Sequence, residues 1–435
     1  MEEEKIMYLS DLLASGMPLE EATELLMNVM WTCLGAFLVF FMQAGFTIVE
    51  AGFTRAKNTG NIIMKNVFDF VLGSIFFYII GFAIMFGPDV AGIIGSGGFF
   101  APTSLADGAG MMHGLPIGVF MIFHTVFCAT SATIVSGAMA ERTNFSAYLI
   151  YSACISIFIY PVTGHWIWSD GWLSRIGFHD FAGSAAVHMV GGICSIIGAK
   201  ILGARIGNFD KNGKVNAIPG HNILMGALGV FILWFCWFGF NCGSTTGATT
   251  NLGDIAMTTN LSTVVATLTV LIITWVRYGK PDVSMTLNGS LAGLVAVTAG
   301  CDVVSDYGAM AIGLIAGFVV VFVVEFLDKV LKIDDPVGAV AVHGGCGLTG
   351  TILTAVFCKS TVLEEMGMSR LHFIGIQVLG VAATAAYVAV MAVIVFTVIN
   401  KTVGLRVSEV EEVEGLDLHE HGMSAYANFR LHDDR

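Results

Sequence analysis

The stretches "DFAGSAAVHMVGG" (180–192) and "DPVGAVAVHGGCG" (335–347) repeat one frame at two distant points of the chain. In each, Asp stands eight residues before a histidine, Gly five before it, and Val immediately before it. The two histidines are His188 and His343. Small apolar residues surround both histidines. If these stretches lie in a membrane, an ionisable side chain there is costly and is a candidate functional residue.

Composition indicates that the solvent around these stretches is lipid. The chain has 435 residues, of which 55% are hydrophobic and 12% are charged, and its mean hydropathy is +0.79. Soluble domains carry roughly a quarter charged residues. Between the charged residues lie apolar runs of about the ~20 residues that cross a bilayer as a helix. We predict eleven spans, at about 27–49, 66–87, 115–138, 145–167, 181–202, 221–243, 253–276, 284–301, 307–327, 336–358 and 371–399.

Lysine and arginine divide unevenly between the loops on the two sides. One set of loops holds twelve of them, whereas the other holds Arg175, Lys359 and Arg370, with Lys5 in the leading segment. Because basic loops stay in the cytoplasm, we expect an outer N-terminal segment (1–26) and a cytoplasmic tail (401–435) around a transport domain (27–400). The chain is then a multi-pass protein of the plasma membrane.

The repeated frame predicts two halves of opposite direction. His188 falls in the fifth span and His343 in the tenth, so each half has an odd number of crossings. Halves at about 27–202 and 221–358 form an inverted repeat, a plan that places substrate paths near mid-membrane. The fold class expected is an all-α membrane protein with a five-plus-five inverted repeat and one extra helix, 371–399.

Small residues share the helical faces of both histidines, which lets the two backbones approach closely. We expect the imidazoles to touch, each fixing the other's tautomer. Two alternatives are a pair of unrelated buried histidines bonded to backbone carbonyls, and a bis-histidine haem or metal site. The small neighbours disfavour haem, and neither GxSxG nor HExxH occurs. We therefore expect no enzyme activity, no cofactor and no metal.

Six stretches resemble the ammonium transporter family (Amt/Mep/Rh), closest to its microbial and plant Amt branch. They are "FMQAGFTIVEAGFTRAKNT" (41–59), "GAMAER" (137–142), "DFAGSAAVH" (180–188), "WFGFNCGS" (237–244), "DDPVGAVAVHG" (334–344) and "GLRVSEVEEVEGLDLHEHGMSAY" (404–426). The resemblance implies a homotrimer of eleven-helix protomers, each with a narrow hydrophobic pore. It also implies a PII-type nitrogen regulatory protein that docks at the cytoplasmic face.

The resemblance assigns roles to seven residues. The twin pore histidines are His188 and His343, and the phenylalanine gate is Phe127 with Phe240. An outer site for ammonium is formed by Phe127, Trp168 and Ser244, with the acid Asp180 beside it. The chemistry suits these roles, since an aromatic face attracts a cation and a hydroxyl accepts an N–H bond, which potassium cannot donate.

Structural roles compete with several of these assignments. Trp168 also fits an interfacial belt, Asp180 a helix N-cap, and Ser244 a bond to a backbone carbonyl. His124, three residues before Phe127, either lines the outer vestibule or packs inside. Glu50, at the end of the first span, is expected to hold neighbouring helices together rather than to conduct.

The function predicted is transport of ammonium or ammonia, with methylammonium as an analogue. Passage of ammonia alone and passage with the proton both fit these residues. The alternative is an ammonium sensor that signals through its tail. The formal net charge of −13 argues against nucleic acid as a partner, which leaves the lipid bilayer, a homotrimer and the regulatory protein.

Overall fold

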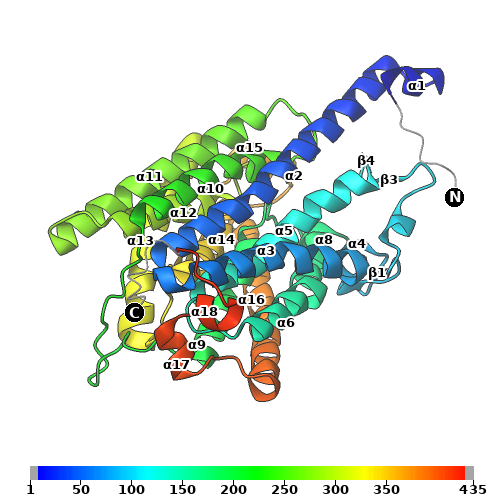
Figure 1. Ribbon diagram of the computed structural model, residues 1–435. Helices are drawn as coiled ribbons and strands as arrows, with labels where there is room; N and C mark the ends of the chain where they lie inside the picture. The colour runs from blue at the N-terminus through cyan, green and yellow to red at the C-terminus, as the bar shows by residue number, and fades with distance from the viewer. Residues whose placement is uncertain (1–7, 427–435) are drawn as a thin grey trace.

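Long apolar helices make up most of the chain in the computed structural model, which describes residues 8–426 (Figure 1). The first part contains α1 (Leu9–Ala14), α2 (Leu19–Phe53), η1 (Ala56–Asn58), α3 (Thr59–Phe76), η2 (Phe77–Gly81), α4 (Phe82–Phe86), η3 (Pro102–Leu105), α5 (Ile117–Ala138), α6 (Phe145–Cys154), η4 (Ile155–Ile159), α7 (Tyr160–Trp168), α8 (Trp172–Arg175), η5 (Ser184–Met189) and α9 (Val190–Leu202). Two small hairpins join β1 (Asp89–Val90) to β2 (Ile94–Gly95) and β3 (Met111–Met112) to β4 (Leu115–Pro116).

The second part repeats the helical pattern and ends in a short folded tail. It contains α10 (Ile223–Gly243), α11 (Leu252–Tyr278), α12 (Val283–Val297), α13 (Asp306–Phe326), η6 (Leu327–Leu331), η7 (Val340–Gly345), α14 (Cys346–Phe357), α15 (Ser360–Glu365), α16 (Arg370–Thr402), α17 (Glu409–Glu414) and α18 (Leu416–His421). Helix α1 and the tail helices α17 and α18 lie at opposite ends of the bundle (Figure 1).

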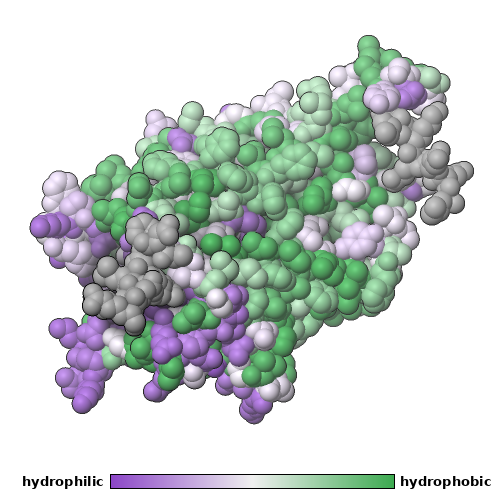
Figure 2. All heavy atoms as spheres, in the orientation of Figure 1, coloured by the Kyte–Doolittle hydropathy of each residue, from purple (hydrophilic) through white to green (hydrophobic). Residues whose placement is uncertain are grey.

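Every predicted span coincides with a helix. Among the described residues, ten helical segments are long and apolar enough to cross a membrane. The predicted span 284–301 corresponds to the shorter apolar helix α12. Figure 2 shows the matching surface: a broad apolar belt, with hydrophilic side chains gathered around the tail. The fold is thus that of a helical membrane protein.

Two helices begin earlier than the predicted spans. Helix α2 begins at Leu19, so part of the expected outer segment 1–26 is helical, while residues 1–7 lie outside the described part. The second span begins at Ala56 rather than at 66. Its first turns carry polar side chains that resemble a loop in sequence, yet Asn58, Asn61 and Lys65 are buried.

Corresponding helices of the two halves pack on each other. Helix α2 lies along α10, and glycines allow the contact: a Cβ on Gly35 would stand 3.0 Å from the Cα of Gly243. The histidine-bearing segments meet in the same way. A Cβ on Gly192 would stand 2.9 Å from the carbonyl carbon of His343. The small residues therefore bring the backbones together as predicted.

The repeated frame encodes one local structure twice. Gly183 (φ +110°) and Gly338 (φ +81°), each five residues before a histidine, adopt the left-handed conformation that favours glycine. Each histidine then lies in a π-helical turn, His188 in η5 and His343 in η7. Such turns often mark functional sites. Neither turn was predicted, since helical periodicity does not distinguish them.

Candidate functional site

An aromatic pocket of about 200 Å³ opens at the end of the bundle away from the tail. It is lined by His113, Phe120, Phe123, His124, Phe127, Trp168, Phe181, Ser244 and Thr246. The three residues expected to form the outer site lie together here, although they come from three different helices or helix ends. The rings of Phe127 and Trp168 meet edge to face, with centroids 6.2 Å apart and an interplanar angle of 83°.

Two polar side chains of this pocket donate hydrogen bonds to backbone carbonyls of the protein. Trp168 Nε1 donates to the carbonyl oxygen of Asp180 over 2.6 Å, which fixes the indole ring. Ser244 Oγ donates to the carbonyl of Phe240 over 2.8 Å. The expected structural bond of Ser244 is therefore present. It uses the hydroxyl proton, so the oxygen lone pairs remain available as acceptors for a donor in the pocket.

Two stacked phenylalanines close the inner side of the pocket. The Phe127 and Phe240 rings lie 4.2 Å apart at 31°, and both residues are fully buried. Phe240 in turn stacks on His188, with centroids 5.2 Å apart. These residues form a continuous line from the pocket to the histidine pair. A molecule that follows this line must displace the Phe rings.

The two histidines touch at the centre of the bundle. His188 Nδ1 and His343 Nδ1 are 3.2 Å apart, and the rings are inclined by 25°. Trp237 stacks on the other face of His188, with centroids 4.9 Å apart and an angle of 19°. His188 Nε2 is buried and has no hydrogen-bond partner among the described residues. A free polar atom at this depth is available to a small polar molecule.

Asp180 lies beside the pocket but does not line it. Its carboxylate accepts bonds from the backbone N–H groups of Gly183, Ala185 and Ala186 at 2.8–3.0 Å. Burial raises the pKa of this carboxyl above its usual range, and the three N–H groups act in the opposite direction. Asp335 caps η7 in the same way, through Ala339 and Val340. The helix-capping role is the one that these contacts show; the expected effect of the Asp180 charge on a cation stays a prediction.

The family model described as Ammonium Transporter Family matches residues 30–426. The chain belongs to this family. It is 42% identical over 431 residues to Ammonium transporter Amt2 of Archaeoglobus fulgidus, covering 94% of this chain and 90% of that protein. A solved structure titled Sensor Amt Protein is 38% identical, with a TM-score of 0.88, 92% of this chain and 100% of that chain being covered. Mep2 of Candida albicans is 25% identical, with a TM-score of 0.79 and coverage of 92% and 90%.

Several residues of the pocket and of the histidine site in this ammonium transporter family member were missed or left open in the sequence. His124 lines the vestibule rather than packing inside, only 8% of its surface is exposed, and its Nδ1 has no partner among the described residues. Phe123 was missed, although it precedes Phe127 by one helical turn. Trp237 was also missed, three residues before Phe240. Both lie in apolar runs where aromatic residues are abundant, so only the fold distinguishes them.

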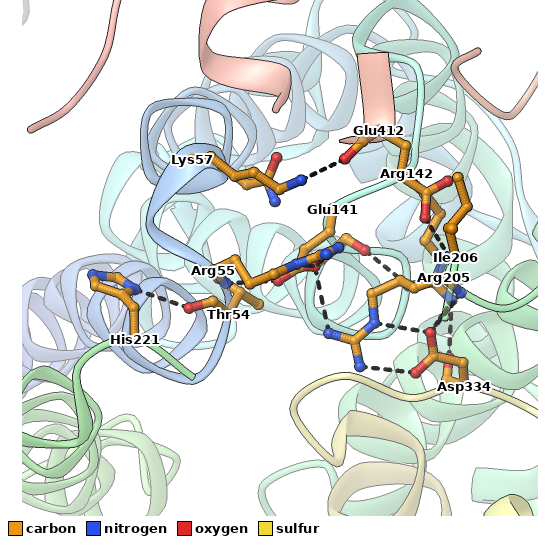
Figure 3. A network of polar contacts seen from close by, with 12 residues as sticks. Thr54, Arg55, Lys57, Glu141, Arg142, Arg205, Ile206, His221, Asp334 and Glu412 are labelled. Carbon is orange, nitrogen blue, oxygen red and sulfur yellow. Dashed lines mark hydrogen bonds and ion pairs between the residues drawn. The ribbon is translucent and has the colours of Figure 1, made fainter. Parts of the chain in front are cut away.

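The tail of this family member folds against its own chain. Lys57 Nζ donates to the carbonyls of Glu412 and Val413, and Asp417 accepts from the N–H of Asn61 at 2.8 Å. The tail also contacts the loop that follows α9. The loop contributes a backbone group, Ile206 N–H, to Glu412, as Figure 3 shows. The tail residues after 426 lie outside the described part.

Proposed function

We propose that the protein conducts ammonium by capturing the ion in the aromatic pocket and passing it as ammonia along His188 and His343. The observation that carries this proposal is the continuous path: an aromatic pocket, a stacked Phe pair, and two touching histidines in one line. Named relatives support the substrate, since the one from Archaeoglobus fulgidus is called an ammonium transporter.

The pocket offers ammonium two kinds of attraction. The faces of Phe127 and Trp168 supply cation–π attraction worth about 0.5–2 kcal/mol. Ser244 Oγ and His124 supply lone pairs for the N–H groups of the ion. Potassium is attracted by the rings but cannot donate hydrogen bonds. Selection for ammonium over potassium therefore depends on the polar acceptors.

Beyond the Phe pair the path favours the uncharged molecule. The walls are apolar, and a bare cation that leaves water for such a medium pays a large desolvation cost. With a bond between the two Nδ1 atoms, one histidine donates there and the other accepts. The donor then carries an acceptor at Nε2, and the acceptor carries an N–H at Nε2. Ammonia, which both donates and accepts, suits this arrangement, whether or not the proton follows by another route.

A sensor is the second candidate function. It is favoured by the close likeness to the structure titled Sensor Amt Protein and by a tail that folds onto the loops below the path. A bis-histidine haem is disfavoured by geometry. The two imidazoles are in direct contact, and a Cβ on Gly347 would stand 2.6 Å from the Ser184 carbonyl oxygen, so a macrocycle has no space between these helices.

We propose the family's assembly and regulation for this chain as well: a homotrimer in the plasma membrane, with the tail in the cytoplasm and a PII-type regulatory protein at that face. The folded tail supports a docking role, because it presents ordered backbone rather than a solvated acidic run. The orientation rests on the uneven lysine and arginine count.

Flux in proteoliposomes tests the central proposal. Vesicles that contain the purified full chain should take up ammonium and methylammonium far faster than protein-free vesicles, and a potassium gradient should give no comparable flux. A protein that binds ammonium but gives protein-free rates is a sensor rather than a transporter.

A further inference from the structure

A second, smaller cavity lies on the tail side of the histidine pair. It measures about 20 Å³, and its lining includes Phe46, Glu50, Asn288, Val337 and His343. A cavity of this size holds about one water molecule, and ammonium has nearly the same dimensions. His343 belongs to the histidine pair and also lines this cavity. The cavity is therefore the next space along the path.

Asn288 presents an unpaired acceptor at this cavity. The residue is 6% exposed, and its Nδ2 donates to the carbonyl of Val337 over 3.1 Å. This bond orients the amide, so the oxygen Oδ1 is the free atom. Oδ1 is buried and has no hydrogen-bond partner among the described residues. Buried polar atoms of this kind are rare and call for a ligand or another explanation.

Glu50 supplies a carboxylate to the same cavity. Its Oε2 accepts from Ser136 Oγ at 2.6 Å and from Asn66 Nδ2 at 3.3 Å, and these bonds join three helices as the sequence predicted. Its Oε1 accepts no hydrogen bond from the described residues, although the side chain is only 2% exposed. A carboxylate at membrane depth is costly and is functional by default.

Glu50 lies near a second buried acid and a buried base. Glu50, Asp69 and Lys65 are each at most 2% exposed. Within the described part of the chain, no ion pair within 4.0 Å joins Lys65 to either acid. Lys65 instead donates to the carbonyl of Ser136 at 3.2 Å and lies over the Tyr148 ring. Lys65 therefore leaves the free Oε1 of Glu50 available to a ligand in the cavity.

Beyond this cavity the path opens into an acidic mouth. A larger cavity of about 230 Å³ shares Asn288, Val337 and Gly338 with the small one. It is also lined by Asp328, by Asp335 and by Asp334, which pairs with Arg205 in the same lining. A cluster of carboxylates at a narrow opening raises the local concentration of cations. Ions in the solution on the tail side thus reach Glu50 and Asn288 through a route that attracts them.

We propose that the small cavity is a cation site for ammonium, in which the Glu50 carboxylate and Asn288 Oδ1 accept N–H bonds from the ion. The inference rests on the proposed transport function and adds a tail-side site to it. This site sets the ammonium concentration at which outward flow saturates. The aromatic pocket sets the concentration for inward flow.

Side-resolved flux tests the site. Sealed membrane vesicles are sorted by whether the tail faces out or in, and methylammonium uptake is measured over a range of concentrations. Glu50→Gln keeps the size and removes the charge. It should raise the half-saturating concentration about tenfold in vesicles with the tail outside, the loss expected for a hydrogen bond to a charged group. Vesicles with the tail inside should keep the parent value.

Asp69→Asn is the matched control, because Asp69 is another buried carboxylate, held by Tyr148 and Ser152 at 2.5 and 2.8 Å, and does not line the cavity. It should give parent values on both sides. Asn288→Ala leaves the hydrogen bonds of Glu50 intact and removes the Oδ1 acceptor. It should also raise the tail-side half-saturating concentration, and it tests the site even if Glu50→Gln does not reach the membrane.

Parent-like tail-side saturation in Asn288→Ala and in any Glu50→Gln protein that reaches the membrane would overturn the site. Equal changes on both sides in Glu50→Gln and Asp69→Asn would show a structural role only. Absence of uptake by the parent on both sides would remove the transport function itself, and the site with it.

Discussion

At the scale of single residues, the bond between His188 and His343 determines which hydrogen-bonding atoms the path presents. Each ring holds the other's Nδ1, and Trp237 and Phe240 stack against His188. Removing one ring leaves the other with an unpaired buried nitrogen and opens a gap beside the path. The pair therefore acts as a unit rather than as two independent sites.

We expect His188→Ala and His343→Ala each to lower ammonium and methylammonium flux about tenfold or more, or to convert it to an unselective cation leak. Flux falls because the remaining histidine has an unsatisfied buried nitrogen, which costs about 1–3 kcal/mol. A cation leak arises if the gap left by the missing ring lets hydrated ions pass. Uptake and potassium competition in proteoliposomes measure both results. The exposed His372→Ala is the control. Parent-like uptake and selectivity in both pore variants would contradict the role of the pair.

The outer pocket predicts a concentration-dependent defect. Trp168→Leu should raise the external half-saturating concentration roughly threefold or more, because a cation–π contact of about 0.5–2 kcal/mol is lost. Ser244→Ala should act in the same direction through its lost acceptor. Both effects should shrink when ammonium is abundant.

Uptake measured from low to high external ammonium tests this prediction. Trp172→Leu is the matched control, since Trp172 packs against Trp166 and does not line the pocket. An unchanged concentration dependence in Trp168→Leu would return Trp168 to a purely structural role.

At the scale of elements, close packing at one glycine contributes to the position of the tail helices α17 and α18. Gly415 has φ +115°, and a Cβ there would stand 2.6 Å from the Cβ of Lys57. Leu416 N–H, the next residue, donates to Asn58 Oδ1 at 2.9 Å. The turn at Gly415 thus brings α18 against α3, and a side chain there would meet both strain and a clash.

We expect Gly415→Ala to release the tail, which increases its cleavage by added protease without removing the protein from the membrane. Gly422→Ala is the control for backbone strain alone, since Gly422 has φ +68° and nothing lies within 4 Å of its Cβ position. Equal cleavage of the two variants would show that close packing at Gly415 does not matter.

Deletion of the residues after Val407 should lower flux while the protein stays in the membrane. It should also abolish regulation by the partner, because both effects depend on the docked tail. Uptake in cells grown with scarce and with abundant nitrogen measures both effects. A truncated protein that conducts normally and still responds to nitrogen would show that the tail has no regulatory role.

At the scale of the whole molecule, buried charges join loops of both halves on the tail side (Figure 3). Arg205 pairs with Asp334 at 2.9 Å and with Glu141 at 3.5 Å, and Glu141 also pairs with Arg55 at 2.5 Å. Burial raises the pKa of Glu141, but Arg205 and Arg55 outweigh it and hold the pKa below its ordinary value of 4.5. Burial likewise acts on Asp334, and Arg142 and Arg205 hold its pKa below 3.8.

This network predicts acid sensitivity. Carboxyls with lowered folded pKa values stabilise the fold at any pH above their ordinary values, and this stability is lost as pH falls through the folded values. The Tm in detergent should therefore drop as pH falls below about 4.5, by roughly 2–4 °C for each kcal/mol lost. Glu141→Gln and Asp334→Asn should lower the Tm at neutral pH and flatten its fall with acid. If the Tm of both variants falls with acid as steeply as that of the parent, the acid-sensitive groups are other than Glu141 and Asp334.

The sequence by itself determined the spans and the repeat, because the signals are local. Apolar length and a repeated Asp, Gly and Val frame are properties of a few consecutive residues. They predicted a helix at each span and the correspondence between the segments around His188 and His343. The outer site was predictable only through the resemblance, since aromatic residues in a lipid-facing run and in a pocket look alike.

Only the tertiary structure decided which side chains share a space. His124 and Phe123 enter the outer pocket, and Asn288 meets Glu50 and His343 although the three are far apart in sequence. Lys65 was placed in a loop by the sequence, yet it is buried within a span. Burial, pairing and cavity lining depend on helix packing between distant segments, and no local pattern carries that information.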